Sequence, residues 1–304
     1  MSVRGHAARG GIFRTLAGHE SNHMNTALIA TAWTSAGNTS PMRSPATSPV
    51  PIHERLKAIA EAGFMGFGLV ADDLMAIRDS IGFAALGAMA AEHGLSHIEI
   101  ELIERWSIPR GQSGHTYHVR DLLLDAADVL KPAFIKIGSE NGSAAIDLAS
   151  LVAPLRELAD DASRLGTRIA IETMPFSRLA TVPVGAELVD AVAHPHVGLL
   201  VDAWHVFRAE TSLTELDTSL LDGIVFGVEL DDAMPEVVGT LFEDTIDRRV
   251  LCGEGSFDLS GLVDVLRGKG FDGPWGVEIL SESFRTLPVG EALQRAAETA
   301  RKVL

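Results

Sequence analysis

Four acidic residues stand at the ends of short apolar segments in the second half of the chain. They are Glu172 in RIAIE, Asp202 in VGLLVD, Glu229 in IVFGVEL and Glu278 in WGVEI. Each segment has the length and apolar character of a strand that is covered on both faces. Alternation along a strand puts a small or apolar residue two positions before each acid on the same face. Because neighbouring strands lie about 4.8 Å apart, four such acids on adjacent strands would converge.

Convergent carboxylates in a partly buried site repel one another and need compensation. Either their pKa values rise or a divalent cation binds between them. A cation is the simpler solution, and an all-oxygen ligand set favours Mn²⁺, Mg²⁺ or Co²⁺ over Zn²⁺. Taken alone, an aspartate at a strand end, such as Asp202, is more often a helix N-cap or a loop residue than a metal ligand. Asp231 and Asp232 follow Glu229 directly, so a shift of register would exchange their roles.

Two residues are expected beside this cluster because of their spacing and their neighbours. His205 follows Asp202 at D-x-x-H spacing, which suits either a substrate-binding or ligand-orienting role or an ordinary loop contact. Lys136 lies inside the apolar segment FIKIG. A lysine facing the helices would be costly, so we expect it to point inward and to neutralise a carboxylate or bind a substrate oxygen.

Three further residues complete the set of candidate substrate-binding residues. Glu101, in HIEIELI, is expected on the inward face of its strand near the top. Trp33 ends ALIATAW and could stack on a sugar ring or simply pack. Arg248 and its neighbour Arg249, in DRRVLCGEGSFDL, could anchor a substrate carboxylate or phosphate, or could lie on the surface. The GEG of this segment is too short to indicate a phosphate loop.

The elements that must position these residues alternate between strand and helix. Eight strand-like segments are expected at residues 27–33, 66–70, 97–103, 134–138, 168–172, 197–202, 224–230 and 275–279. Helical patterns lie between them, at 52–62, 73–93, 147–165, 259–269 and 289–304, and the first four each stop at a glycine. This alternation indicates parallel βαβ units. Eight units predict a single-domain α/β fold, the (β/α)₈ TIM barrel, over residues 24–304.

Two stretches are longer than ordinary connections. Residues 34–51 are rich in Ser, Thr and Pro and follow the first strand, and residues 104–119 follow the third. In barrels of this kind the active site is built from the loops that follow the strands. We therefore expect at least one of these segments to contact the substrate.

Composition restricts the partners and the compartment. The formal net charge of −16, without any Lys/Arg-rich run, argues against nucleic acid and anionic membranes. The longest apolar-rich run, Ile81–Ala91, is too short to span a bilayer. The single cysteine, Cys252, allows no intrachain disulfide and fits a reducing cytoplasm. Residues 1–23 lack the apolar core of a secretory signal and are expected to be a disordered extension, with Met24 opening the folded part. A homo-oligomer is compatible with the sequence.

Together these segments resemble the xylose isomerase-like TIM barrels of the sugar phosphate isomerase/epimerase superfamily. The motifs that carry the resemblance are IAIETMPF, LLVDAWH, VELDDA, RRVLCGEGSFDL and GPWGVEIL, and the likeness runs from about Thr26 to Leu304. It implies metal ligands at Glu172, Asp202, the seventh-strand position and Glu278. His205 matches the histidine of the family's D-x-x-H. At the seventh strand many members carry His and some dehydratase-type members carry Gln, whereas this chain has Glu229.

The resemblance implies a metal-dependent enzyme that acts on a small polyhydroxylated carbonyl compound. In epimerase members the two ligand glutamates, here Glu172 and Glu278, also form the acid/base pair. We expect a sugar or sugar-phosphate isomerase/epimerase that removes a proton next to the carbonyl and passes through an enediolate. The alternatives are a lyase resembling 3-dehydroshikimate dehydratases or 3-oxo-glycoside deglycosidases, and a barrel that binds without catalysis. DNA-repair endonucleases of the superfamily need more histidines and a basic face, so that alternative is set aside.

Overall fold

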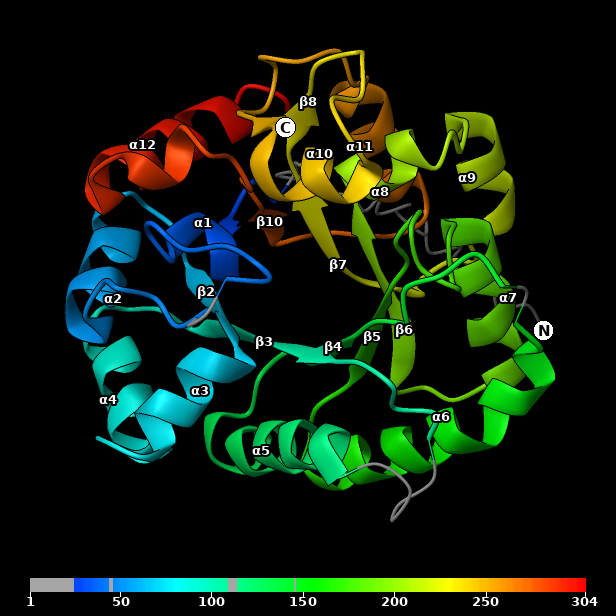
Figure 1. The fold of residues 1–304 in the computed structure, drawn as a ribbon, viewed down its shortest axis with the longest axis horizontal. Coiled ribbons are helices and arrows are strands. Elements are labelled where there is room, and N and C mark those ends of the chain that lie inside the picture. Colours follow the sequence, from blue (N-terminus) through cyan, green and yellow to red (C-terminus); the bar gives the residue numbers. More distant parts are fainter. Residues whose placement is uncertain (1–24, 44–45, 109–113, 145) are drawn as a thin grey trace, which may run out of the picture.

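The eight predicted strands close into one parallel barrel in the computed structural model, which describes residues 25–43, 46–108, 114–144 and 146–304. The helices surround the strands (Figure 1). The order around the barrel is β1, β2, β3, β4, β5, β6, β7, β10, with β10 pairing to β1. The barrel strands are β1 (Leu28–Ala30), β2 (Gly66–Val70), β3 (His97–Ile103), β4 (Phe134–Ile137), β5 (Ile169–Glu172), β6 (Val197–Asp202), β7 (Val225–Leu230) and β10 (Trp275–Val277). The predicted (β/α)₈ fold is therefore confirmed.

The helices lie between the strands, as predicted, but one predicted helix is interrupted. They are α1 (Ala32–Ser35), α2 (Ile52–Glu61), α3 (Ala71–Arg78), α4 (Phe83–Glu92), α5 (Gly114–Leu130), α6 (Leu148–Arg164), α7 (Val182–Val192), α8 (Ala203–Arg208), α9 (Leu213–Ser219), α10 (Leu241–Asp247), α11 (Leu259–Gly268), α12 (Val289–Ala300) and the 3₁₀ turn η1 (Phe284–Thr286). The single helix predicted over 73–93 is wrong: it is broken into α3 and α4. Gly82, with φ of +79°, stands before α4 in a conformation that no helix interior accepts.

The long connection between β7 and β10 contains a small hairpin over the carboxyl ends of the strands. Its strands, β8 (Asp232–Ala233) and β9 (Arg249–Val250), pair antiparallel, with Ala233 opposite Arg249. Backbone N–H groups of Gly253, Gly255 and Phe257 donate to the Asp232 carboxylate at 3.0–3.1 Å. The glycine-rich turn therefore binds a carboxylate of its own chain.

The barrel interior has two layers of different character. Phe134, Ala170 and Leu200 form an apolar layer, which Phe226 also contacts. Two residues further along β4, β5 and β6 stand Lys136, Glu172 and Asp202, so the same strand faces turn from apolar to charged. Gly227 is required in the apolar layer because a Cβ there would lie 2.6 Å from the Phe134 ring. The large hydrophobic core lies outside the barrel, between strands and helices.

The predicted N-terminal extension lies outside the described residues. The expected long loop after β1 begins with α1, and the expected loop over 104–119 passes into α5 at Gly114. Within the described ranges, no single helix is long and apolar enough to cross a membrane. Only α3 and α4 taken together meet that criterion, and they are bent by 106°.

Candidate active site

The four acids singled out in the sequence converge at the carboxyl ends of β5, β6, β7 and β10. Glu172, Asp202, Glu229 and Glu278 are all buried, and one oxygen of each lies within 4.8 Å of the others. Parallel pairing sets Asp202 opposite Glu229, and Gly276 opposite Glu229 on the other side. The predicted meeting of the four carboxylates is therefore present in the structure.

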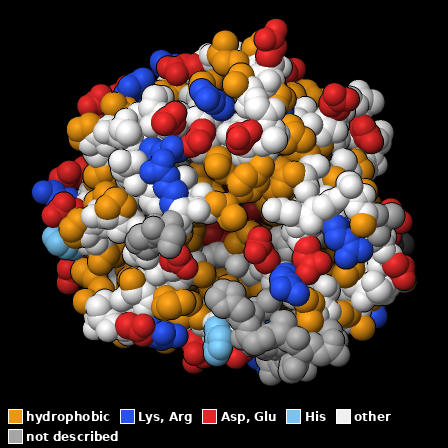
Figure 2. Space-filling model, in the orientation of Figure 1, with side chains coloured by type: hydrophobic (Ala, Val, Ile, Leu, Met, Phe, Trp, Pro, Cys, Tyr) orange, Lys and Arg blue, Asp and Glu red, His pale blue; other side chains and the backbone are white. Residues whose placement is uncertain are grey.

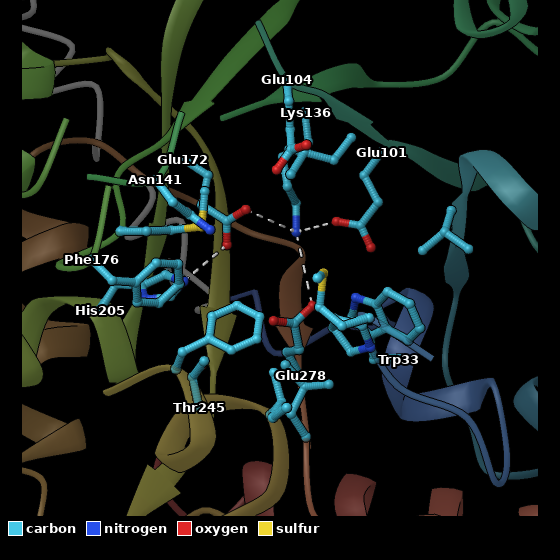
Figure 3. A pocket seen from close by; sticks show the side chains of 18 of the residues that line it. Trp33, Glu101, Glu104, Lys136, Asn141, Glu172, Phe176, His205, Thr245 and Glu278 are labelled. Atoms are coloured by element: carbon cyan, nitrogen blue, oxygen red, sulfur yellow. Dashed lines mark ion pairs between the residues drawn. The ribbon is translucent and has the colours of Figure 1, made fainter. Parts of the chain in front are cut away.

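Lys136 points from β4 into this cluster, as predicted. Its ammonium nitrogen lies 2.5 Å from Glu101 Oε2 and 2.6 Å from Glu229 Oε1. The same nitrogen is 3.7 Å from Glu172 and 3.8 Å from Glu278 (Figure 3). Burial alone would lower the pKa of Lys136, but the surrounding glutamates raise it well above its ordinary value. The lysine is therefore charged and neutralises part of the cluster.

Arg249 reaches the site, whereas the predicted substrate-binding residue Arg248 does not. Arg248 is exposed, whereas Arg249 is buried on β9. Arg248 is the C-cap residue of α10, and β9 begins with Arg249. The Arg249 guanidinium contacts Asp202 at 2.7 Å, Glu278 at 3.3 Å and Asp231. Both arginines were predicted to anchor a substrate anion. The sequence could not show that Arg249 forms ion pairs with carboxylates of the protein itself.

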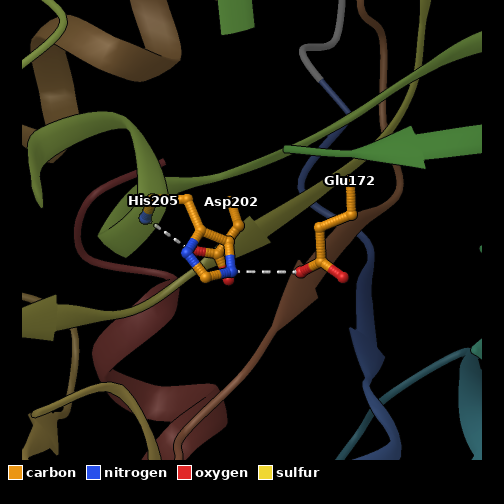
Figure 4. Close-up of side chains that lie close together, drawn as sticks. All are labelled: Glu172, Asp202 and His205. Carbon is orange, nitrogen blue, oxygen red and sulfur yellow. Dashed lines mark hydrogen bonds and ion pairs between the residues drawn. The ribbon is translucent and has the colours of Figure 1, made fainter. Parts of the chain in front are cut away.

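Asp202 caps a helix and also lies in the acidic cluster. Its Oδ1 accepts the backbone N–H of His205 at 2.9 Å, which caps the first turn of α8. The same carboxylate belongs to the acidic cluster. The cap turns the His205 ring toward β5, where Nε2 lies 3.3 Å from Glu172 Oε1 (Figure 4). The D-x-x-H spacing is thus a short helical turn that places the histidine beside a buried acid.

The pKa values of Glu172 and Glu278 differ because the two side chains have different neighbours. Burial would raise the pKa of Glu172, but Lys136 and the hydrogen bond from His205 lower it to about 2. Burial raises the pKa of Glu278 to about 7, against the opposing effects of Lys136 and Arg249. Burial, together with the neighbouring Glu278, also raises the pKa of Glu229 well above its ordinary value. Without a cation, the surroundings favour the ionised form of Glu172 and the protonated forms of Glu229 and Glu278.

Several buried oxygens of the cluster have no hydrogen-bond partner among the described residues. They are Glu101 Oε1, Glu229 Oε2, Asp231 Oδ1 and Glu278 Oε1. Buried polar atoms are nearly always paired, so four orphaned acceptors in one place indicate that a partner binds there. Two of them belong to the four-carboxylate group whose oxygens approach within 4.8 Å. The donor set and its spacing fit a divalent cation with oxygen ligands.

A cavity of about 160 Å³ opens over the cluster. Figure 2 shows a hollow at the centre of this face, with acidic side chains at its floor and hydrophobic ones around it. Glu101, Lys136, Glu172, His205, Arg249 and Glu278 supply the buried polar surface. The other lining residues are mostly apolar: Trp33, Pro41, Met42, Val70, Leu102, Met174, Phe176, Phe242, Ile246 and Leu280, with Glu104, Asn141 and Thr245 as polar exceptions. Asp202 and Glu229 lie behind this lining.

The residues that line the cavity can be compared with those predicted from the sequence. The loop after β1 supplies Pro41 and Met42 to the cavity wall, and the expected contact of this loop with the substrate stays a prediction. Trp33 lines the cavity, but it lies in α1 and not at the end of the first strand as predicted; Trp204 and Trp275 are fully buried. The apolar walls were missed, because Phe176 and Phe242 come from distant connections with no periodic pattern. Only their position after predicted strands could have indicated them.

The chain matches the family model described as xylose isomerase-like TIM barrel over residues 56–303. It belongs to this family. Two relatives with known names are an inosose isomerase of Halalkalibacterium halodurans and a 3-dehydroshikimate dehydratase of Pseudomonas putida. The first is 29% identical over 157 residues, which cover 51% of this chain and 54% of the relative. The second is 27% identical over 263 residues, which cover 83% of this chain and 39% of the relative. The chain thus spans about half, or less, of these relatives.

Solved structures show the same fold at low sequence identity. The IolI protein, solved with a zinc atom bound, superposes with a TM-score of 0.75 at 22% identity, covering 91% of this chain and 98% of that one. The 3-keto-D-glucoside 4-epimerase YcjR of E. coli superposes with a TM-score of 0.67 at 16% identity, covering 91% of this chain and all of that one. At this identity the likeness concerns the fold alone.

Proposed function

We propose that this protein is an isomerase or epimerase that moves a proton next to the carbonyl group of a small polyhydroxylated compound. The observation that carries the proposal is the placement of Glu172 and Glu278. Both are buried and line the same cavity, and one oxygen of each lies within 4.8 Å of the other. Two carboxylates with different surroundings at one cavity suit a general base and a general acid. The names of the relatives support the same class of chemistry.

The residues that would hold a divalent cation are Glu172, Asp202, Glu229 and Glu278. Their oxygen ligands favour Mn²⁺, Mg²⁺ or Co²⁺, and the zinc of the IolI structure keeps Zn²⁺ among the candidates. When bound, such an ion polarises a substrate carbonyl and makes the neighbouring C–H more acidic. Carboxylates can bind a cation only when they are deprotonated, so the protons held by Glu229 and Glu278 would be released.

Glu172 is the better candidate for the base. Lys136 and His205 both favour its ionised form, and the carboxylate faces the cavity. It would take the proton from the carbon beside the carbonyl, which leaves an enediolate. Lys136 lies within 4 Å of both Glu172 and Glu278 and can stabilise the negative charge that develops between them. Return of the proton to the opposite face of the same carbon gives an epimer, and return to the neighbouring carbon gives an isomer.

Elimination is the second candidate reaction. It uses the same first step, but the intermediate then expels a β-hydroxyl or alkoxyl group, and the proton that Glu172 has taken would pass to the departing oxygen. The match to the P. putida 3-dehydroshikimate dehydratase, which covers most of this chain, favours this alternative. A barrel that binds its ligand without catalysis is the third alternative, and it predicts no exchange of substrate protons.

Solvent exchange tests the proposal directly. The protein is incubated in D₂O with Mn²⁺ and a panel of ketoses, inososes and 3-dehydroshikimate, and deuterium at the carbon beside the carbonyl is measured by NMR. We expect incorporation by the unaltered protein and a loss of about 10²- to 10⁴-fold in Glu172→Gln and Glu278→Gln. Absence of exchange with every compound, in folded protein that contains metal, would overturn the proposal. Product analysis on the same samples separates epimer, isomer and dehydrated product.

A further inference from the structure

The charges that line the cavity lead to an inference about the substrate, which rests on the function proposed above. We propose that the substrate is an uncharged, single-ring polyhydroxy ketone and that the cavity rejects phosphorylated and carboxylated compounds. Three observations carry this inference: both buried cations are already paired, carboxylates outnumber cations, and the volume and apolar walls suit one ring.

Both cations of the cavity are held by acids of the protein. Lys136 is in contact with Glu101 and Glu229 at 2.5 and 2.6 Å, and Arg249 with Asp202 at 2.7 Å and with Asp231. Both side chains are almost completely buried, so neither can turn to meet an anion without leaving a buried carboxylate unpaired. The described residues that line the cavity include no other lysine or arginine. A substrate phosphate would find no free cationic partner among them.

The acids around the cavity outnumber these cations. Six buried carboxylates, from Glu101, Glu172, Asp202, Glu229, Asp231 and Glu278, face Lys136 and Arg249. A divalent cation would offset only part of the difference, and protonation of some acids would remove charge without creating a site for an anion. Glu104 adds a further acid to the lining. The described lining therefore offers no surplus of positive charge to compensate an incoming anion for the loss of its hydration.

The size and the walls of the cavity suit a single ring. Its volume of about 160 Å³ is close to the roughly 150 Å³ of an engineered apolar cavity that takes up benzene. Trp33 and Phe176 lie on opposite sides of the carboxylates (Figure 3), and Phe242 packs edge-on against Phe176 with ring centroids 5.4 Å apart. A cyclic polyol offers C–H faces to such walls and hydroxyl groups at its edge to the polar floor. A charged substituent would have to lie against apolar side chains.

Matched pairs of compounds test this inference in the full chain loaded with Mn²⁺. One pair is a ketohexose and its 6-phosphate, and the other is an inosose and 3-dehydroshikimate, which is a ring ketone with a carboxylate. Binding is measured by calorimetry and by the shift of the unfolding temperature. We expect the uncharged member of at least one pair to bind at least 100-fold more tightly, and millimolar inorganic phosphate to give no stabilisation after Mn²⁺ binding is saturated.

A charge placed at the cavity provides the matched control. Met42 lines the cavity, and its side chain is 82% exposed, so Met42→Arg and Met42→Gln should both fold. We expect the arginine variant to bind the anionic members several-fold more tightly than the glutamine variant does. Equal or tighter binding of an anionic member by the unaltered protein overturns the inference, and so does failure of both uncharged compounds to bind. Uncharged compounds that bind without deuterium exchange would overturn the proposed reaction and leave the charge preference standing.

Discussion

Two buried clusters of charged side chains in this barrel differ in whether their hydrogen bonds are satisfied: the ion pair of Arg55 and Asp73, and the acidic cluster at the barrel mouth. Arg55, on α2, forms an ion pair of 2.5 Å with Asp73, on α3, and its remaining donors reach Ser35 Oγ at 2.8 Å and the Ala32 carbonyl at 2.7 Å. The second oxygen of Asp73 accepts the Ser48 N–H at 2.8 Å. At the barrel mouth, by contrast, four carboxylate oxygens have no hydrogen-bond partner in the described part of the chain.

The difference separates a structural role from a functional one. A buried ion pair whose hydrogen bonds are all made holds the chain in place and leaves nothing for a ligand. A buried cluster with unpaired acceptors and excess negative charge costs stability until something binds. Arg55 and Asp73 join α1, α2 and α3 behind the cavity and need no partner. The acidic cluster is complete only with a partner, which our proposal identifies as a divalent cation.

The largest loss of stability is expected when the ion pair of Arg55 and Asp73 is broken. Arg55→Met leaves the Asp73 carboxylate buried without its partner, so we expect a loss of about 3–5 kcal/mol in the free energy of unfolding. Urea denaturation measures it. The double variant Arg55→Met/Asp73→Leu should recover part of the loss, because no unpaired charge remains. The metal content of folded Arg55→Met protein should equal that of the unaltered chain, and a loss of metal there would show that the two groups are not separate.

A substitution in the acidic cluster is expected to change the free energy of unfolding in the opposite direction. Glu229→Gln removes one of the repelling acids while Lys136 keeps its contact with Glu101. The metal-free variant should therefore be as stable as the unaltered chain or more stable, by about 1–2 kcal/mol, and it should bind Mn²⁺ more weakly. Denaturation in the presence of a chelator gives the stability, and calorimetry gives the affinity. A loss of stability as large as that of Arg55→Met would contradict the comparison.

A smaller effect is expected from pH in the metal-free protein. The pKa of Glu278 is about 7 in the folded state, against an ordinary value of 4.5, so the folded protein keeps a proton that the unfolded chain releases. The stability that this group contributes is therefore lost as the pH rises from about 4.5 to 7. Glu172, with a pKa of about 2, acts only below that window. Thermal unfolding with a chelator should show that Glu278→Gln flattens the slope between pH 5 and 7.

The sequence predicted the barrel and its acidic cluster because both depend on short-range patterns. Apolar segments with period-two alternation place Glu172 and Glu278 at strand ends. Closure of the barrel then brings these strand ends together. The break at Gly82 was missed because the apolar pattern continues across it. The sequence did not show which of Arg248 and Arg249 points into the site, because this depends on the pairing of β8 with β9.

The apolar walls of the cavity could not be predicted from the sequence. Met42, Phe176 and Phe242 come together only when connections from three parts of the chain meet over the barrel. The pairing of Lys136 with Glu101 was likewise open, because an inward lysine can face several acids. The expected cytoplasmic location and the compatible homo-oligomer stay predictions.

Bound metal tests the central claim most directly. The unaltered protein and the double variant Glu172→Gln/Glu278→Gln are dialysed against Mn²⁺, and the metal in each is measured by mass spectrometry, with circular dichroism as the check on folding. We predict about one Mn²⁺ per unaltered chain and none in the folded double variant. Absence of metal from the unaltered chain, or equal metal in both proteins, would contradict the claim that the unpaired carboxylates form a divalent-cation site.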